Sequence, residues 1–168
     1  MIDPSTLPVY QSRGEILCAL EKSQVIIVES PTGSGKTTQI PLILNEAGYA
    51  ERGIIGITQP RRIAAVSVSE FIKKQIGDTA SFCGYTMRFH DTTDSTTRIK
   101  IMTDGIILQE VKADPLLSRY SVIMVDEAHE RSLNIDFILG LLKEIIPQRP
   151  ELRVIISSAT INTKTQRR

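Results

Sequence analysis

The chain has 168 residues, with 20 Lys plus Arg and 19 Asp plus Glu, so its formal net charge is only +1. The apolar fraction of 41% and the charged fraction of 23% exclude a disordered chain, which needs low hydrophobicity and high net charge. No apolar run approaches the ~18 residues of a membrane span, and no secretory signal is visible. We therefore expect no membrane partner and a cytoplasmic location, or a nuclear one if the organism is eukaryotic. Cys18 and Cys83 form no disulfide or zinc pattern, so a reduced compartment is the default.

Five short apolar runs rich in Val and Ile predict buried strands, because continuous hydrophobicity is typical of a parallel sheet covered on both faces. In chain order these are Val25–Glu29, Gly53–Thr58, Ile99–Met102, Ser121–Asp126 and Val154–Ser157, with a further candidate at Gly84–Phe89. Segments with helical spacing lie between or beside them: Arg13–Glu21, Thr37–Glu46, Arg61–Ile76, Gly105–Val111 and Leu133–Ile146. The polar run Asp91–Thr97 predicts an exposed loop. Strands that alternate with helices predict an α/β domain with a mostly parallel central sheet.

The segment 30–37, SPTGSGKT, joins the first predicted strand to the next helix, which is the position of a Walker A phosphate-binding loop. Gly33 and Gly35 lack Cβ atoms, so the backbone can curl and direct its N–H groups at phosphate oxygens. Lys36 can reach the β- and γ-phosphates, and the Thr37 hydroxyl can ligate Mg²⁺. The alternative is a Gly/Ser turn, but the strand–loop–helix context favours a nucleoside triphosphate site. The residues expected to contact the nucleotide are Thr32, Gly33, Ser34, Gly35, Lys36, Thr37 and Thr38.

Two acids, Asp126 and Glu127, end the strand predicted at Ser121–Asp126, an arrangement typical of a Walker B motif. Asp126 can hold Mg²⁺, because this hard cation prefers oxygen ligands, and Glu127 can orient and deprotonate an attacking water. The alternative is an acidic helix N-terminus, which the helix dipole favours. Combined with the loop at Lys36, the pair favours a metal site formed by Thr37, Asp126 and Glu127.

The tetrapeptide Asp126–His129, followed by Glu-Arg-Ser, resembles the corresponding motif of the DEAH-box/RNA helicase A family of superfamily 2 helicases. The resemblance covers nearly the whole chain and rests on five ordered blocks. These are GSGKTTQIP (33–41), TQPRRIAA (58–65), TDGIILQE (103–110), DEAHERS (126–132) and SAT (158–160). It implies that residues 1–168 form the first of two RecA-like domains, a P-loop NTPase fold with helices on both faces of the sheet.

The resemblance further implies an ATP-dependent RNA helicase domain that uses ATP and Mg²⁺ and moves 3′ to 5′ along single-stranded RNA. It implies contacts to the RNA sugar–phosphate backbone, which carry no base code, so binding independent of RNA sequence is expected. The residues implied for these contacts are Pro60, Arg61, Arg62, Thr103, Asp104 and Gly105. Without the resemblance, a solvated helix start would explain the Arg pair equally well. Arg88 either extends this basic track or pairs with Asp91.

Coupling residues also follow from the resemblance. It places His129 in the catalytic set beside Lys36 and Glu127, as the link to the SAT block. The hydroxyls of Ser158 and Thr160 can bond to the acidic motif and transmit the nucleotide state. The alternative for both is capping of the following turn.

The base of the nucleotide has no assigned partner, because the DEAH group lacks the glutamine motif that would give Gln11 this role. In several members of this family a basic residue on the helix after the TQPRRIAA block stacks on the base; the resemblance places Phe71 near that position, where its ring could stack instead. The chain contains nothing that matches the second RecA-like domain, whose arginine fingers contribute about 10³–10⁵ in rate. By itself it is expected to bind nucleotide, hydrolyse it very slowly and unwind nothing.

Two other functions stay open. One is a DExH helicase domain that acts on DNA, and the other is a non-catalytic, nucleotide-binding interaction module. The intact residues Lys36, Asp126 and Glu127 disfavour the module.

Overall fold

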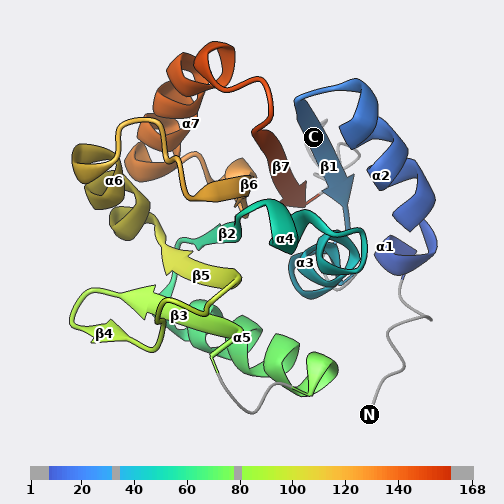
Figure 1. Ribbon diagram of the computed structural model, residues 1–168, viewed down its shortest axis with the longest axis horizontal. Coiled ribbons are helices and arrows are strands. Elements are labelled where there is room, and N and C mark those ends of the chain that lie inside the picture. The colour runs from blue at the N-terminus through green and yellow to red at the C-terminus, as the bar shows by residue number, and fades with distance from the viewer. Residues whose placement is uncertain (1–7, 32–34, 78–80, 160–168) are drawn as a thin grey trace, which may run out of the picture.

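A single mixed sheet organises the chain, with its strands in the order β1-β7-β6-β2-β5-β3-β4 (Figure 1). The computed structural model describes residues 8–31, 35–77 and 81–159. All neighbouring strands pair in parallel except β3 and β4, which form an antiparallel hairpin. The structure therefore confirms the predicted α/β class and the mostly parallel sheet.

The predicted elements are present, and their bounds move by one to a few residues. The strands are β1 (Val25–Ser30), β2 (Ile54–Gln59), β3 (Cys83–Met87), β4 (His90–Asp91), β5 (Ile99–Thr103), β6 (Tyr120–Val125) and β7 (Arg153–Ala159). The α-helices are α1 (Pro8–Gln11), α2 (Arg13–Lys22), α3 (Lys36–Glu46), α4 (Tyr49–Arg52), α5 (Arg62–Ile76), α6 (Asp104–Ala113) and α7 (Leu133–Ile145). Two 3₁₀ turns are η2 (Ala128–Glu130) and η3 (Ile146–Gln148).

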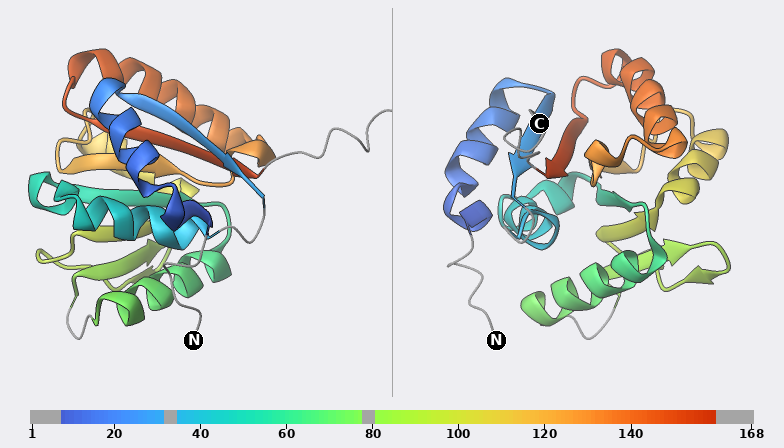
Figure 2. Two further views of the ribbon diagram at one scale, coloured as in Figure 1. Left: turned by 90° about the vertical axis from the view of Figure 1, so that its right-hand side faces the viewer. Right: turned by 180° about the vertical axis from the view of Figure 1, so that it is seen from behind.

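Helices cover both faces of the sheet, and each face has its own core. Apolar side chains from α1 to α5 pack with one set of strand residues, including Ile57, Ile101 and Met124. Those of α6 and α7 pack with the alternate set, including Ile123 and Val154 (Figure 2). Adjacent strand residues thus point into opposite cores, which is why the central strands carry continuous apolar runs instead of alternating apolar and polar residues.

The edge strand β1 departs from this prediction. Val25–Glu29 was expected to be buried on both faces, but alternate residues of β1 are exposed, and Ile27 is 66% exposed. Its other residues, Ile26 and Val28, pack against the core on the side of α1 to α5. The expectation of a fully buried strand was wrong because β1 lies at the end of the strand order.

Three smaller features were missed or misplaced. The segments α1 and α4 are too short to show helical periodicity, and neither was predicted. The expected loop Asp91–Thr97 begins instead with the last residue of β4. In its remainder, backbone N–H groups and hydroxyls of Thr residues donate hydrogen bonds to Asp carboxylates. The strand suggested at Gly84–Phe89 is confirmed as β3. No helix among the described residues is long and apolar enough to cross a membrane.

A close approach of β2 to β6 requires glycine at position 56. A Cβ atom there would lie 2.7 Å from Cε1 of Tyr120 and 3.1 Å from Cε of Met102. We expect Gly56→Ala to lower the free energy of unfolding by about 1–3 kcal/mol, the usual cost of overpacking a core. Gly140→Ala is the matched control, since a Cβ on this glycine of α7 meets nothing within 4 Å. It should raise stability by about 0.5–1 kcal/mol through helix propensity. Urea unfolding measures both, and an unchanged Gly56→Ala protein would contradict the packing argument.

Candidate nucleotide and nucleic-acid site

The carboxyl ends of the parallel strands bring the candidate residues to one edge of the sheet. Ser30 ends β1, Gln59 ends β2, Thr103 ends β5 and Ala159 ends β7, while Asp126 directly follows β6. In open α/β sheets, ligands bind at this edge. The sites predicted from separate motifs therefore share one location.

The phosphate-binding loop reaches the described residues at Gly35, and its members Thr32, Gly33 and Ser34 lie outside them. Gly35 has φ +87°, a left-handed conformation that residues with a Cβ rarely adopt, and it directly precedes α3. Lys36 begins α3 with a buried side chain, and its Nζ donates a hydrogen bond to the Ser30 carbonyl at 3.3 Å. The Thr38 hydroxyl donates a hydrogen bond to the Gly35 carbonyl at 3.3 Å, which stabilises the end of the loop.

Thr37 and Asp126, which are 89 positions apart, are in direct contact. The Thr37 hydroxyl donates to Oδ2 of Asp126 at 2.7 Å, and Nε2 of Gln59 donates to the same oxygen at 2.5 Å. The second oxygen, Oδ1 of Asp126, is buried and has no hydrogen-bond partner among the described residues. A buried carboxylate with one free oxygen beside a hydroxyl is an all-oxygen donor set, which suits Mg²⁺.

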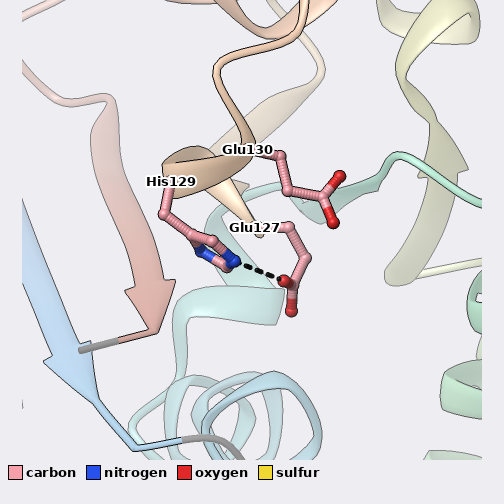
Figure 3. A group of neighbouring side chains, drawn as sticks. All are labelled: Glu127, His129 and Glu130. Atoms are coloured by element: carbon pink, nitrogen blue, oxygen red, sulfur yellow. Dashed lines mark ion pairs between the residues drawn. The ribbon is translucent and has the colours of Figure 1, made fainter. Parts of the chain in front are cut away.

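Glu127 and His129 face each other at the end of β6 (Figure 3). Glu127 has φ +58°, a strained conformation for a residue with a side chain, and such strain is typical of functional sites. His129 Nε2 lies 3.3 Å from Oε2 of Glu127. The opposite nitrogen, Nδ1, accepts a hydrogen bond from the backbone N–H of Ala159 at 3.1 Å. Because that N–H can only donate, the proton of a neutral His129 sits on Nε2 and points at Glu127.

The environment of Glu127 fits the role of a base that the sequence predicts for it. Burial raises the pKa of the Glu127 carboxyl above its ordinary value, and the negative charge of Asp126 raises it further. The positive charge of Lys36 acts in the opposite direction, as does that of His129 whenever its ring is protonated. A raised pKa makes a carboxylate a stronger base toward water than an exposed glutamate.

Ala159 of the SAT block contacts the acidic motif through its backbone N–H. The contact between β7 and His129 uses the amide of Ala159, whereas the sequence had pointed to the hydroxyls of Ser158 and Thr160. Ser158 is half-buried at the end of β7, and Thr160 lies outside the described residues. The structure thus joins His129 to Ala159 of the SAT block by a backbone atom that no side-chain pattern reveals.

A second group of possible metal ligands surrounds the same turn. Single ligand atoms of Glu127, His129 and Glu130 lie within 4.8 Å of one another. Each side chain already has a partner: His129 bonds to Glu127 and Ala159, and Glu130 forms an ion pair with Arg61. We interpret this group as an ion-pair network and not as a cation site.

The predicted RNA contacts fall into two short segments beside the acidic motif. Pro60 follows β2, Arg61 has extended backbone, and the exposed Arg62 begins α5. Thr103 ends β5 half-buried, and Gly105 is exposed in the first turn of α6.

Asp104 differs from these neighbours. Its side chain is only 4% exposed, and its Oδ1 has no hydrogen-bond partner among the described residues. Burial raises the pKa of Asp104 to about 6, and the negative charges of Glu130 and Asp126 add to the shift. The carboxyl therefore belongs to the interior next to the acidic motif.

The family model for DEAD/DEAH box helicases matches residues 12–168. The chain belongs to the DEAD/DEAH box helicase family.

Relatives within this family are closely similar over the same span. A Borreliella burgdorferi protein named ATP-dependent RNA helicase HrpA is 58% identical over 159 residues, which are 94% of this chain and 19% of that protein. The Escherichia coli protein of the same name is 52% identical over 95% of this chain and 12% of its own length. A Caenorhabditis elegans protein named probable ATP-dependent RNA helicase DHX35 homolog is 49% identical over 94% of this chain and 22% of its own length. The chain thus spans between an eighth and a quarter of the length of these helicases.

Sequence reasoning about this DEAD/DEAH box helicase domain missed three contact residues: Gln59, Glu130 and Ala159. Gln59 was quoted only as part of the TQPRRIAA block, although its position at a strand end could have indicated a site residue. Among the residues left open, Arg88 stacks over the Phe89 ring at 4.9 Å, and the described residues include no ion pair between Arg88 and Asp91. Phe71 is half-buried on α5 and Gln11 is exposed at the end of α1, so their roles stay predictions.

Proposed function

We propose that this chain is the nucleotide-binding and hydrolysing domain of an ATP-dependent RNA helicase that uses Mg²⁺. The observation that carries the proposal is the contact of Thr37 with Asp126, next to Lys36 and Glu127, at the carboxyl edge of the sheet. Lys36, Thr37, Asp126 and Glu127 are the residue types that phosphoryl transfer uses from such a domain, and all four lie at or beside this edge. This disfavours a non-catalytic binding module, and the RNA helicase names of the relatives support RNA over DNA.

The chemistry follows from the positions of these side chains. Lys36, now bonded to the Ser30 carbonyl, would exchange that acceptor for the β- and γ-phosphate oxygens. The oxygens of Thr37 and Asp126 would hold Mg²⁺, which neutralises charge that develops on the phosphates. Glu127 would take the proton of the attacking water, and His129 holds its carboxylate in place through the Nε2 contact.

RNA and a second RecA-like domain complete the proposed helicase. Arg61, Arg62 and the segment 103–105 would contact the RNA backbone, while arginines of the second domain would stabilise the transferring phosphoryl group. Opening and closing of the two domains would then shift the grip along one strand.

Nucleotide binding by the chain tests the proposal. We expect Thr37→Ala to weaken ADP binding in the presence of Mg²⁺ by at least about tenfold, because it removes one metal ligand. Thr37→Ser keeps the hydroxyl and should bind as the unchanged chain does. Titration calorimetry with and without Mg²⁺ measures both variants. Equal affinity of all three proteins for Mg²⁺–ADP would contradict the assignment, and failure of the unchanged chain to bind ADP would remove the proposed function.

A comparison of polymers tests the substrate class. Single-stranded RNA should bind more tightly than DNA of the same sequence, and the reverse order would favour the DNA-acting alternative.

A further inference from the structure

An ion pair connects the proposed RNA contact with the proposed catalytic turn. Nη2 of Arg61 lies 2.6 Å from Oε1 of Glu130. Arg61 directly precedes α5, and Glu130 ends the turn η2 that begins after Glu127. The two residues are distant in sequence and come from neighbouring strand ends, β2 and β6.

The Arg61 side chain is exposed enough to bind an RNA phosphate, although Glu130 already occupies it. It is 66% exposed, so a phosphate oxygen can approach it. Its guanidinium binds carboxylates and phosphates through the same N–H groups, so Glu130 and a phosphate compete for them. The Arg61 end of the pair is open to solvent, although Glu130 is only 25% exposed, so a polyanion can reach the guanidinium and displace the carboxylate.

The other end of the pair is close to the catalytic carboxylate. Ligand atoms of Glu130, Glu127 and His129 lie within 4.8 Å of one another, and Glu130 projects on the side of Glu127 away from His129 (Figure 3). Two carboxylates at this separation interact strongly in a partly buried site. A change in the partner of Glu130 therefore changes the electrostatic environment of Glu127, the residue proposed to activate water.

The neighbouring Arg62 differs from Arg61 in its ion pairing. Arg62 is also exposed, yet it forms no ion pair with the described residues. Of the two adjacent arginines, one is held by the catalytic turn and the other is available at once to a nucleic acid.

We propose that Glu130 is a positioning residue. Its carboxylate holds the Arg61 guanidinium until an RNA phosphate takes the place of that carboxylate. RNA binding is thereby transmitted to the turn that carries Glu127. The inference rests on the proposed contact of Arg61 with RNA and adds Glu130 as the residue that senses it.

A double-mutant cycle on this chain tests the inference, with a fluorescent single-stranded oligouridine as the probe and anisotropy as the readout. Glu130→Gln keeps the shape of the side chain but releases Arg61. We expect it to tighten RNA binding by about three- to tenfold at low salt. In a protein that already carries Arg61→Ala, Glu130→Gln should change RNA affinity only by as much as the removal of one negative charge does. A merely structural role for Glu130 would weaken RNA binding instead.

Glu70→Gln supplies the charge control, because Glu70 is an exposed acid of α5 with no ion pair among the described residues. The inference is overturned if Glu130→Gln tightens RNA binding no more than Glu70→Gln, or equally in both Arg61 backgrounds. Equal RNA affinity of Arg61→Ala and the unchanged chain would remove the Arg61 contact and, with it, this inference. Binding of Mg²⁺–ADP, measured separately, shows whether the nucleotide-site part of the proposed function survives.

Discussion

Glu127→Gln is expected to slow ATP hydrolysis by about 10²–10⁴-fold, the usual contribution of a general base, while nucleotide binding is retained. The amide cannot accept the proton of the attacking water, but it keeps the size of the side chain and can still interact with His129. Hydrolysis is measured in the proposed full-length helicase, with the proposed second RecA-like domain and RNA present, since the chain alone is expected to turn over slowly. Binding of a fluorescent ADP analogue to the same protein is the control.

The pH dependence of the unchanged enzyme provides a second readout of the same residue. Glu127 must be deprotonated to act as a base, and burial together with Asp126 raises its pKa. Hydrolysis should therefore decline as the pH falls through this raised pKa, at a higher pH than an exposed glutamate would allow. Activity of Glu127→Gln within tenfold of the unchanged enzyme would show that another group takes the proton.

Asp104→Asn is expected to stabilise the fold at neutral and alkaline pH and to lose this effect in acid. Burial raises the pKa of Asp104 from 3.8 to about 6, so the folded state binds this proton more tightly than the unfolded chain does. The free energy of unfolding therefore falls as the pH rises from about 4 to about 6, and the loss persists above that range. A shift of about two units corresponds to about 3 kcal/mol, an upper bound on the gain from the neutral amide.

Urea unfolding of the unchanged chain and of Asp104→Asn at pH 4 and pH 8 measures this effect. The difference in unfolding free energy between the two proteins at each pH gives the contribution of Asp104. Asp91→Asn is a control of opposite sign. Burial raises the pKa of Asp91, but hydrogen bonds from Thr93 and Thr86 outweigh it and leave the pKa lowered. That variant should be less stable than the unchanged chain at pH 8, and the difference should shrink in acid. A gain for Asp104→Asn that is equal at both pH values would show that Asp104 is not buried with a raised pKa.

The helices and strands could be predicted where the chain is long and strongly patterned. Continuous Val- and Ile-rich runs identified the strands β2, β5, β6 and β7, because strands buried on both faces carry apolar side chains in most positions. The short helix α4 and the two-residue strand β4 were not predicted, since neither contains a full period of its element. The exposure of β1 was missed because hydrophobicity cannot distinguish a central strand from one at the edge.

The candidate site likewise contains residues that the sequence predicted and a contact that it did not. Lys36, Thr37, Asp126 and Glu127 were identified from their motifs, and the structure places Thr37 against Asp126 as expected. The bond from Gln59 to Asp126 depends on β2 and β6 being neighbours in the sheet, which the order of the strands along the chain does not reveal.

The amino-acid sequence by itself determined the chemical inventory of this protein: the glycines and lysine of a phosphate loop, two adjacent acids, and an arginine pair at a helix start. These are local patterns, and the short-range geometry of a strand–loop–helix unit is enough to interpret them. Only the tertiary structure decided which of these groups touch. The ion pair of Arg61 with Glu130, the amide of Ala159 on His129 and the burial of Asp104 arise because parallel pairing brings distant strand ends to one edge. Strand order is set by packing of the whole core, so no single segment encodes these contacts.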